Sequence, residues 1–159
     1  MAATVAMPTI SSSTGEAAQQ SPSTVPPNPT VAKACGHELD EQFGVGRKFI
    51  IHRVQPGDSL EGYATTYQTS LAAIQGVNAQ PVVPLRADQI IVIPVNQKAI
   101  DEVPLFDAYQ LSERDTTVGK VASMLASTNL NEFLLYNGIS TTCPFFSGWV
   151  LAPRERPSP

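Results

Sequence analysis

The feature that most constrains the fold is a succession of strand-like and helix-like segments that occurs twice in the chain. The segments of residues 49–94 recur in weaker form about 58–60 residues later. Asn137 stands where Asn78 stands in the first copy, and Pro153 stands where Pro94 stands. Two tandem copies explain these matches better than chance, so we expect two small folded units of the same topology.

The first copy begins with a strand and a turn. Phe49–Val54 is rich in β-branched and aromatic residues, which predicts a strand. Gln55–Asp58 contains a proline and a glycine and predicts a turn. Asp58 or Ser59 then caps a helix, and for Asp58 a capping role is favoured over that of a sugar ligand. Four residues at helical spacing predict the buried face of this helix: Leu60, Tyr63, Ala64 and Tyr67.

The first copy continues with a second helix and a second strand. Thr69 or Ser70 caps that helix, which ends near Asn78. Ile90–Ile93 predicts a strand that is ended by Pro94. The two strands are expected to pair antiparallel beneath the helices.

The second copy has the same order of elements. It consists of a strand at Phe106–Leu111, a helix capped by Asp115 or Thr116, a helix from Asn129 to Asn137–Gly138, and a strand at Trp149–Leu151 stopped by Pro153. The expected fold class is therefore α+β, with two βααβ modules that each place two helices on a two-stranded antiparallel sheet.

The first copy resembles a known family in its motifs. The run Val54-Gln-Pro-Gly-Asp-Ser-Leu60, the later Thr69-Ser70 and Asn78, and a strand closing in Ile-Pro resemble the LysM domain over residues 50–94. Residues 106–153 resemble it distantly. They offer Ser112-Glu-Arg-Asp115 in place of Gln-Pro-Gly-Asp, and keep Leu134–Gly138 and Ser147–Leu151.

The resemblance implies a domain that binds glycans containing N-acetylglucosamine, such as peptidoglycan or chitin. The ligand of the family lies in a shallow groove between the first strand–helix loop and the loop before the last strand. Carried onto this sequence, one wall consists of Gly57, Asp58, Ser59 and Leu60. The other wall consists of Asn78, Ala79, Gln80, Pro81 and Val82. No cofactor, catalytic residue or metal is implied.

The expected organisation has six parts. These are a disordered tail (1–34), a linker (35–48), the LysM module (49–95), a second linker (96–105), the degenerate LysM-like module (106–154) and a short tail (155–159). The first part is rich in Pro, Ser and Thr and has almost no large apolar side chains, so it cannot offset the entropy of ordering.

Composition excludes several classes of protein. A net charge of −4 and an isoelectric point near 5.0 argue against nucleic-acid binding. No apolar run approaches the roughly 18–20 residues that span a bilayer. Residues 1–30 lack the features of a secretory signal, so we expect either an intracellular protein or part of a longer secreted precursor. The resemblance favours an extracellular or cell-envelope location.

The two cysteines leave two alternatives open. Cys35 and Cys143 can form one disulfide, or they are two unrelated thiols. A metal site near Cys35 is disfavoured although His37, Glu38, Asp40 and Glu41 follow it, because no second group of ligands has zinc-like spacing. No serine triad, paired carboxylates, phosphate-binding loop or recognisable cysteine–histidine pair is present.

Two sets of aromatic residues have alternative roles. Tyr63 and Tyr67 could stack on a sugar ring, but their spacing favours core packing. Phe145, Phe146 and Trp149 are expected in the core or between modules, with an exposed Phe145–Phe146 contact patch as the alternative.

We therefore expect a non-catalytic cell-wall attachment module. The alternative is a structural or self-assembling surface protein that uses LysM folds for contacts with itself or with another protein. Arg86-Ala-Asp-Gln89, which replaces the usual Pro-Gly-Gln of the family, slightly favours this alternative.

Overall fold

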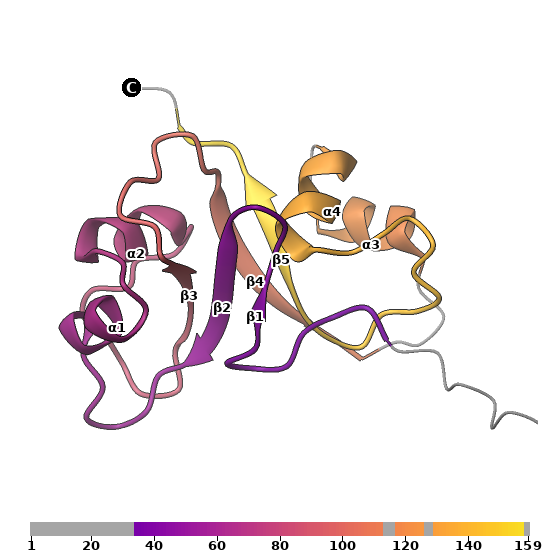
Figure 1. Cartoon of the computed structure of the whole chain (residues 1–159). Helices are drawn as coiled ribbons and strands as arrows, with labels where there is room; N and C mark the ends of the chain where they lie inside the picture. The colour runs from indigo at the N-terminus through magenta and orange to yellow at the C-terminus, as the bar shows by residue number, and fades with distance from the viewer. Residues whose placement is uncertain (1–33, 113–116, 126–128, 158–159) are drawn as a thin grey trace, which may run out of the picture. The chain divides into compact units, whose positions relative to one another are not determined.

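The computed structural model describes residues 34–112, 117–125 and 129–157 of the chain (Figure 1). It is a mixed α+β structure. Its elements are β1 (Gln42–Phe43), β2 (Lys48–Arg53), α1 (Leu60–Thr66), α2 (Leu71–Val77), β3 (Ile90–Val95), β4 (Leu105–Leu111), α3 (Val118–Met124), α4 (Leu130–Asn137) and β5 (Gly148–Arg154). The expected disordered tail lies almost entirely outside the described residues.

Two antiparallel sheets organise these elements. Strands β1, β2 and β3 form the first sheet in that order, and β2 pairs with β3 from Lys48 opposite Val95 to Arg53 opposite Ile90. Strands β4 and β5 form the second sheet. Two units of β–α–α–β order result, as expected, and Figure 1 shows each helix pair beside its own strands.

Local hydrogen bonds set the start of each helix. Ser59 caps α1 by accepting from the Gly62 amide at 3.1 Å, and Ser70 caps α2 by accepting from the Ala73 amide at 3.0 Å. Each hydroxyl satisfies an amide that the helix leaves without a partner. Of the two caps expected for α1, Asp58 or Ser59, the structure uses Ser59. In the second unit Asn129 caps α4 as expected.

The first helix of the second unit is capped by Thr117. The expected caps Asp115 and Thr116 lie outside the described residues.

Both closing strands continue past the proline that was expected to end them. β3 runs to Val95 and includes Pro94, and β5 runs to Arg154 and includes Pro153. β3 lies at the edge of its sheet, and β5 belongs to a sheet of two strands. A proline is tolerated in such strands because the N–H that it lacks would face away from the partner strand.

Strands β3 and β5 are buried on both faces, which explains their continuous apolar runs. In β3, Ile91 and Ile93 pack with the first helix pair, whereas Val92 packs in a central cluster with Leu151 of β5. In β5, Val150 and Ala152 pack with the second helix pair. Successive side chains of a strand point to opposite faces. The strand pair of each unit is therefore covered by its own helices on one face and by the other unit on the opposite face.

The central cluster uses equivalent residues of the two units. Phe49 and Phe106 stand opposite Pro94 and Pro153 in their respective sheets, and their rings meet edge to face at 5.0 Å. Tyr136 contacts both rings. This arrangement makes the interface between units part of one apolar core.

Residues 34–43, which we call the crossing segment, contact both units. Cys35 and His37 form β-bridges with Phe146 and Trp149 near and in β5, and Gln42–Phe43 form β1 beside β2. A disulfide joins Cys35 to Cys143. Much of the segment expected to be a linker is thus paired with one unit or the other.

The aromatic residues have the roles expected from their spacing. Phe146 is fully buried in the second core, and Trp149 packs against the central cluster. Tyr63 is 7% exposed in the first core, with Tyr67 packed beside it. Because Phe146 is buried, no exposed Phe145–Phe146 pair is available as a contact patch.

Candidate functional site

The turn between β2 and α1 is closed by the Asp58 side chain. One carboxylate oxygen accepts the Gln55 backbone N–H at 2.6 Å, and the Asp58 amide donates to the Gln55 carbonyl at 3.1 Å. Gly57 has φ of 93°, a conformation that favours glycine. A Cβ at this position would meet no atom within 4 Å. The space beside the Gly57 backbone, where a Cβ would lie, is therefore open.

The same Asp58 oxygen makes two further polar contacts inside the unit. It accepts the Tyr63 hydroxyl at 2.5 Å and lies 3.3 Å from Nε2 of His52. The hydrogen bonds from Tyr63 and Gln55 lower the pKa of Asp58 from its usual value of 3.8. Burial and the bond to Asp58 raise the pKa of Tyr63 far above its usual value. Asp58 is therefore an ionised acceptor and Tyr63 is a neutral donor at physiological pH.

The loop between α2 and β3 surrounds a hollow of about 380 Å³. Its lining consists of Gln75, Asn78, Ala79, Gln80, Pro81, Val82 and Val83. Ala79 is half-buried, Gln80 and Pro81 are exposed, and Val82 is buried. Val82 shares an apolar cluster with Leu60, so a common core supports both expected walls of the groove.

Asn78 supports the loop from inside. Its side-chain amide donates to the carbonyls of Ile74 and Val92 at 2.7 and 2.8 Å, and its Oδ1 accepts the Val92 N–H at 2.8 Å. The side chain thereby ties the end of α2 to β3. Its hydrogen-bonding groups are used within the protein, so Asn78 would shape the groove rather than contact a ligand through its side chain.

The replacement of the usual Pro-Gly-Gln does not disturb this end of the unit. Asp88 adopts φ of 65° at the position of the family's glycine, a conformation that aspartate tolerates better than most residues. Gln89 donates from Nε2 to the Pro81 carbonyl at 2.9 Å and accepts the Arg86 N–H at 3.2 Å. These bonds hold the loop before β3 against the strand, so the departure preserves the turn.

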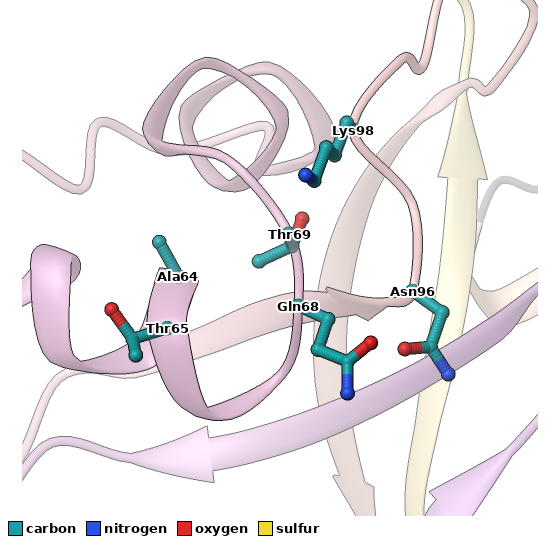
Figure 2. Close-up of a pocket in the computed structure, with 6 residues that line it drawn as sticks. All are labelled: Ala64, Thr65, Gln68, Thr69, Asn96 and Lys98. Atoms are coloured by element: carbon teal, nitrogen blue, oxygen red, sulfur yellow. The ribbon is translucent and has the colours of Figure 1, made fainter.

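A larger hollow of about 680 Å³ lies at the opposite end of the helix pair (Figure 2). It is lined by Ala64, Thr65, Gln68, Thr69, Asn96 and Lys98, where α1 ends and α2 begins. The Thr69 hydroxyl donates to the Gln97 carbonyl at 2.5 Å. None of the residues expected to bind a glycan lines this hollow, so size alone does not make it the binding site.

The second unit repeats the asparagine of the first. Asn137 bonds to the carbonyls of Phe133 and Leu151 at 2.8 Å each and to the Leu151 N–H at 2.7 Å. Beside it, a hollow of about 330 Å³ is lined by Gly138, Ile139 and Ser140 together with crossing-segment residues. Most of Ser112–Asp115, the counterpart of the Gln-Pro-Gly-Asp turn, lies outside the described residues.

The cysteines and histidines make contacts within the protein. Both sulfurs are in the disulfide, so neither is a nucleophilic thiol. His37 lies with Nε2 2.7 Å from the Asn137 carbonyl, and the Asp40 carboxylate contacts His52. Within the described part of the chain, no three His, Cys, Asp or Glu side chains are grouped as metal ligands.

The comparison with known protein families gives a match in the first unit. Residues 52–94 match the LysM domain. The matched range begins at His52 in β2 and ends at Pro94 in β3, and so contains both the turn and the loop hollow. The LysM domain is in general a non-catalytic module that binds peptidoglycan or chitin, found in cell-envelope or extracellular proteins.

Two further findings concern curated relatives and membrane-spanning helices. The comparison with curated proteins gives no match. Within the described residues, no helix has the length and apolar character needed to cross a membrane.

Two residues of this region were missed by sequence reasoning as parts of the site. His52 was expected only as part of the strand Phe49–Val54, and Asp40 only as part of the linker and of a disfavoured metal site. The single polar ring within the apolar run of β2 was the available signal for His52. No local signal marks Asp40, because its contact with His52 depends on the path of the crossing segment.

Proposed function

We propose that the LysM unit of this protein binds glycans that contain N-acetylglucosamine, in the groove between the β2–α1 turn and the α2–β3 loop. The observation that carries this proposal is the match of residues 52–94, which spans both walls. The residues proposed to form the two walls of the groove are Gly57, Asp58, Ser59 and Leu60 in the turn, and Asn78, Ala79, Gln80, Pro81 and Val82 in the loop.

The chemistry of these walls suits an acetamido sugar. The open backbone at Gly57 offers peptide groups that can pair with the acetamide, and the turn holds them in place before the ligand arrives. The apolar loop residues Pro81 and Val83, both exposed, can accept the acetyl methyl group. A hollow of about 380 Å³ holds little more than one or two sugar rings. We therefore expect weak binding at a single site, strengthened by multivalency on a polymer.

The test is retention of the purified protein on insoluble chitin and on peptidoglycan, at low and high salt. Ala79→Trp fills the loop hollow with an indole ring while keeping an ordinary backbone conformation. Ala72→Trp is the matched control, because Ala72 is exposed on α2 and does not line the hollow. Gly57→Trp is a weaker choice, since its positive φ would strain any larger residue.

The proposal expects the wild type and Ala72→Trp to be retained and Ala79→Trp to be lost by at least about tenfold. Equal recovery of all three proteins would place the site elsewhere. Failure of the folded wild type to bind either polymer would overturn the proposal. The polymer that retains the protein identifies the glycan class.

A non-catalytic attachment role at the cell wall follows from such binding, and would place the protein in the cell envelope or outside the cell. The alternative role is assembly with itself or another protein through LysM folds. The burial of Phe146 removes the aromatic patch that this role would use. The replacement at Arg86–Gln89, which was expected to favour this role, keeps the turn through the positive φ of Asp88. Sedimentation over a concentration series separates the two, since only the assembly role requires association.

A further inference from the structure

His52 lies between two carboxylates that come from different parts of the chain. Its Nδ1 contacts Oδ1 of Asp40 in the crossing segment, and its Nε2 lies 3.3 Å from Oδ2 of Asp58 in the β2–α1 turn. The side chain of His52 is only 13% exposed. Its ring also packs edge to face on Tyr63 at a centroid distance of 4.9 Å.

The hydrogen-bonding capacity of these groups decides the protonation state that fits. An ionised carboxylate only accepts, and a neutral imidazole donates from one nitrogen alone. Asp58 already accepts from Gln55 and Tyr63, and these bonds favour its ionised form. A neutral ring would therefore set a lone pair against one of the two carboxylates. Only the imidazolium can donate to Asp40 and Asp58 together.

The other groups around His52 do not replace this proton. Tyr63 of α1 donates its hydroxyl to Asp58. Tyr67 lies near the same two aspartates, and its pKa is raised mainly by burial and further by these two carboxylates. Opposite His52 on β3 stands the apolar Ile91. The neighbouring Arg53 follows His52 on β2. Asp40 is itself held in position, because its backbone N–H donates to the Ile51 carbonyl at 2.9 Å.

We infer that His52 is a positioning residue that makes glycan binding pH-dependent, because the protonated ring holds Asp58 and its turn in the binding-competent shape. This inference rests on the proposed glycan function. When pH rises and the ring loses its proton, it can donate to one carboxylate only. Its nearer contact is with Asp40, so the bond to Asp58 is the one lost, and the turn is then held by Gln55 and Tyr63 alone. The groove wall formed by this turn then binds the acetamido sugar less well.

The first test is retention on chitin between about pH 5.5 and pH 8.5, a range that brackets ordinary histidine titration. Chitin serves better than peptidoglycan because its acetamides do not titrate in this range. The wild type should bind about threefold to tenfold more weakly at the high end, the change expected from one partly exposed charge-assisted bond. His52→Gln should abolish the dependence, and Asp40→Asn, which removes one of the two carboxylates, should alter it.

The control variant is Glu61→Gln, which removes an exposed carboxylate of α1 that has no side-chain contact with His52. It should keep the wild-type pH profile. Binding by the wild type that is flat across the range, or a profile in His52→Gln equal to that of the wild type, would overturn the inference.

A second measurement keeps the inference separate from the glycan proposal and from folding defects. The His52 ring and the Gly57 amide are followed by NMR in the free wild-type protein as pH rises. The two should titrate with one midpoint. If they do while no polymer is retained at any pH, the switch stands and the glycan proposal fails. If the Gly57 amide does not respond to His52, the switch itself is wrong.

Discussion

At the scale of single residues, two asparagines join a helix to a strand in the same way in both units. Asn78 bonds to residues four before and fourteen after it, and Asn137 repeats both spacings. Asn137 is fully buried, whereas Asn78 is half-buried. An amide in this position satisfies three backbone groups that water cannot reach easily, so its loss costs more than one ordinary hydrogen bond.

We therefore expect Asn137→Ala to lower the free energy of unfolding by about 3 kcal/mol, because it leaves buried backbone groups unpaired. Asn78→Ala should cost less, since water can partly replace its side chain. Urea denaturation with matched slopes measures both effects. Asn131→Ala, at an exposed site of α4, is the control and should be near neutral. An Asn137 variant as stable as the control would contradict this account.

Asp58 gives a second prediction at this scale, which concerns acid. Its pKa is lowered in the folded protein, first by the Tyr63 hydroxyl and next by the Gln55 amide. A lowered pKa contributes stability that is present above the unfolded value and is lost as pH falls through the folded one. Asp58→Asn should therefore be less stable than the wild type at neutral pH, and the gap should close below pH 3.8.

Thermal unfolding across a pH series checks this prediction. Asp88→Asn is the matched control, since asparagine also tolerates the positive φ found there. A gap between Asp58→Asn and the wild type that persists at low pH would show that the carboxylate charge is not the cause.

At the scale of elements, the sequence predicted what depends on neighbours along the chain. Helical spacing and the hydroxyl or amide at each start located α1, α2 and α4 because capping is local. The extensions of β3 and β5 through Pro94 and Pro153 were missed, since a proline's effect depends on which edge of a strand is paired. β1 was also missed. Two residues carry no periodic signal, and its partner is chosen by the path of the crossing segment.

In the candidate site, too, the local feature was predicted and the long-range contact was not. The Gln-Pro-Gly-Asp turn was visible in the sequence because its residue types demand a turn, and the turn is closed by Asp58. The contact of Asp40 with His52 was not visible. It joins residues on separate elements, and nothing at either position specifies the other.

The packing of the two strand pairs against each other gives a prediction at the element scale. Phe49 and Phe106 are nearly fully buried and meet edge to face. Leucine at either position should cost about 1–2 kcal/mol through lost contacts. The double variant should cost less than the sum, because the aromatic pair itself contributes about 0.5–1.5 kcal/mol. A double-mutant cycle by chemical denaturation measures this coupling, and strict additivity would show that the rings do not interact energetically.

At the scale of the whole described fold, the two units share one core, and several connections cross between them. The central cluster contains side chains from the strand pairs of both units. Arg156 donates to the carbonyls of Val103 and Gly76, which ties the C-terminal strand's extension to the first unit. The crossing segment pairs with β2 at one end and contacts β5 at the other. A disturbance of the crossing segment should therefore affect both units.

The disulfide offers the direct test of that coupling. Cys35 and Cys143 are 108 residues apart, and closing so long a loop restricts the unfolded chain by an amount worth about 4–5 kcal/mol in the chain-entropy model. The double variant Cys35→Ser/Cys143→Ser should unfold at a much lower urea concentration than the wild type, and in a single transition because the core is shared. Reductant should lower the wild-type midpoint toward that of the variant and leave the variant unchanged. Two free thiols in the unreduced wild type, with no response to reductant, would show that the bond does not form in solution.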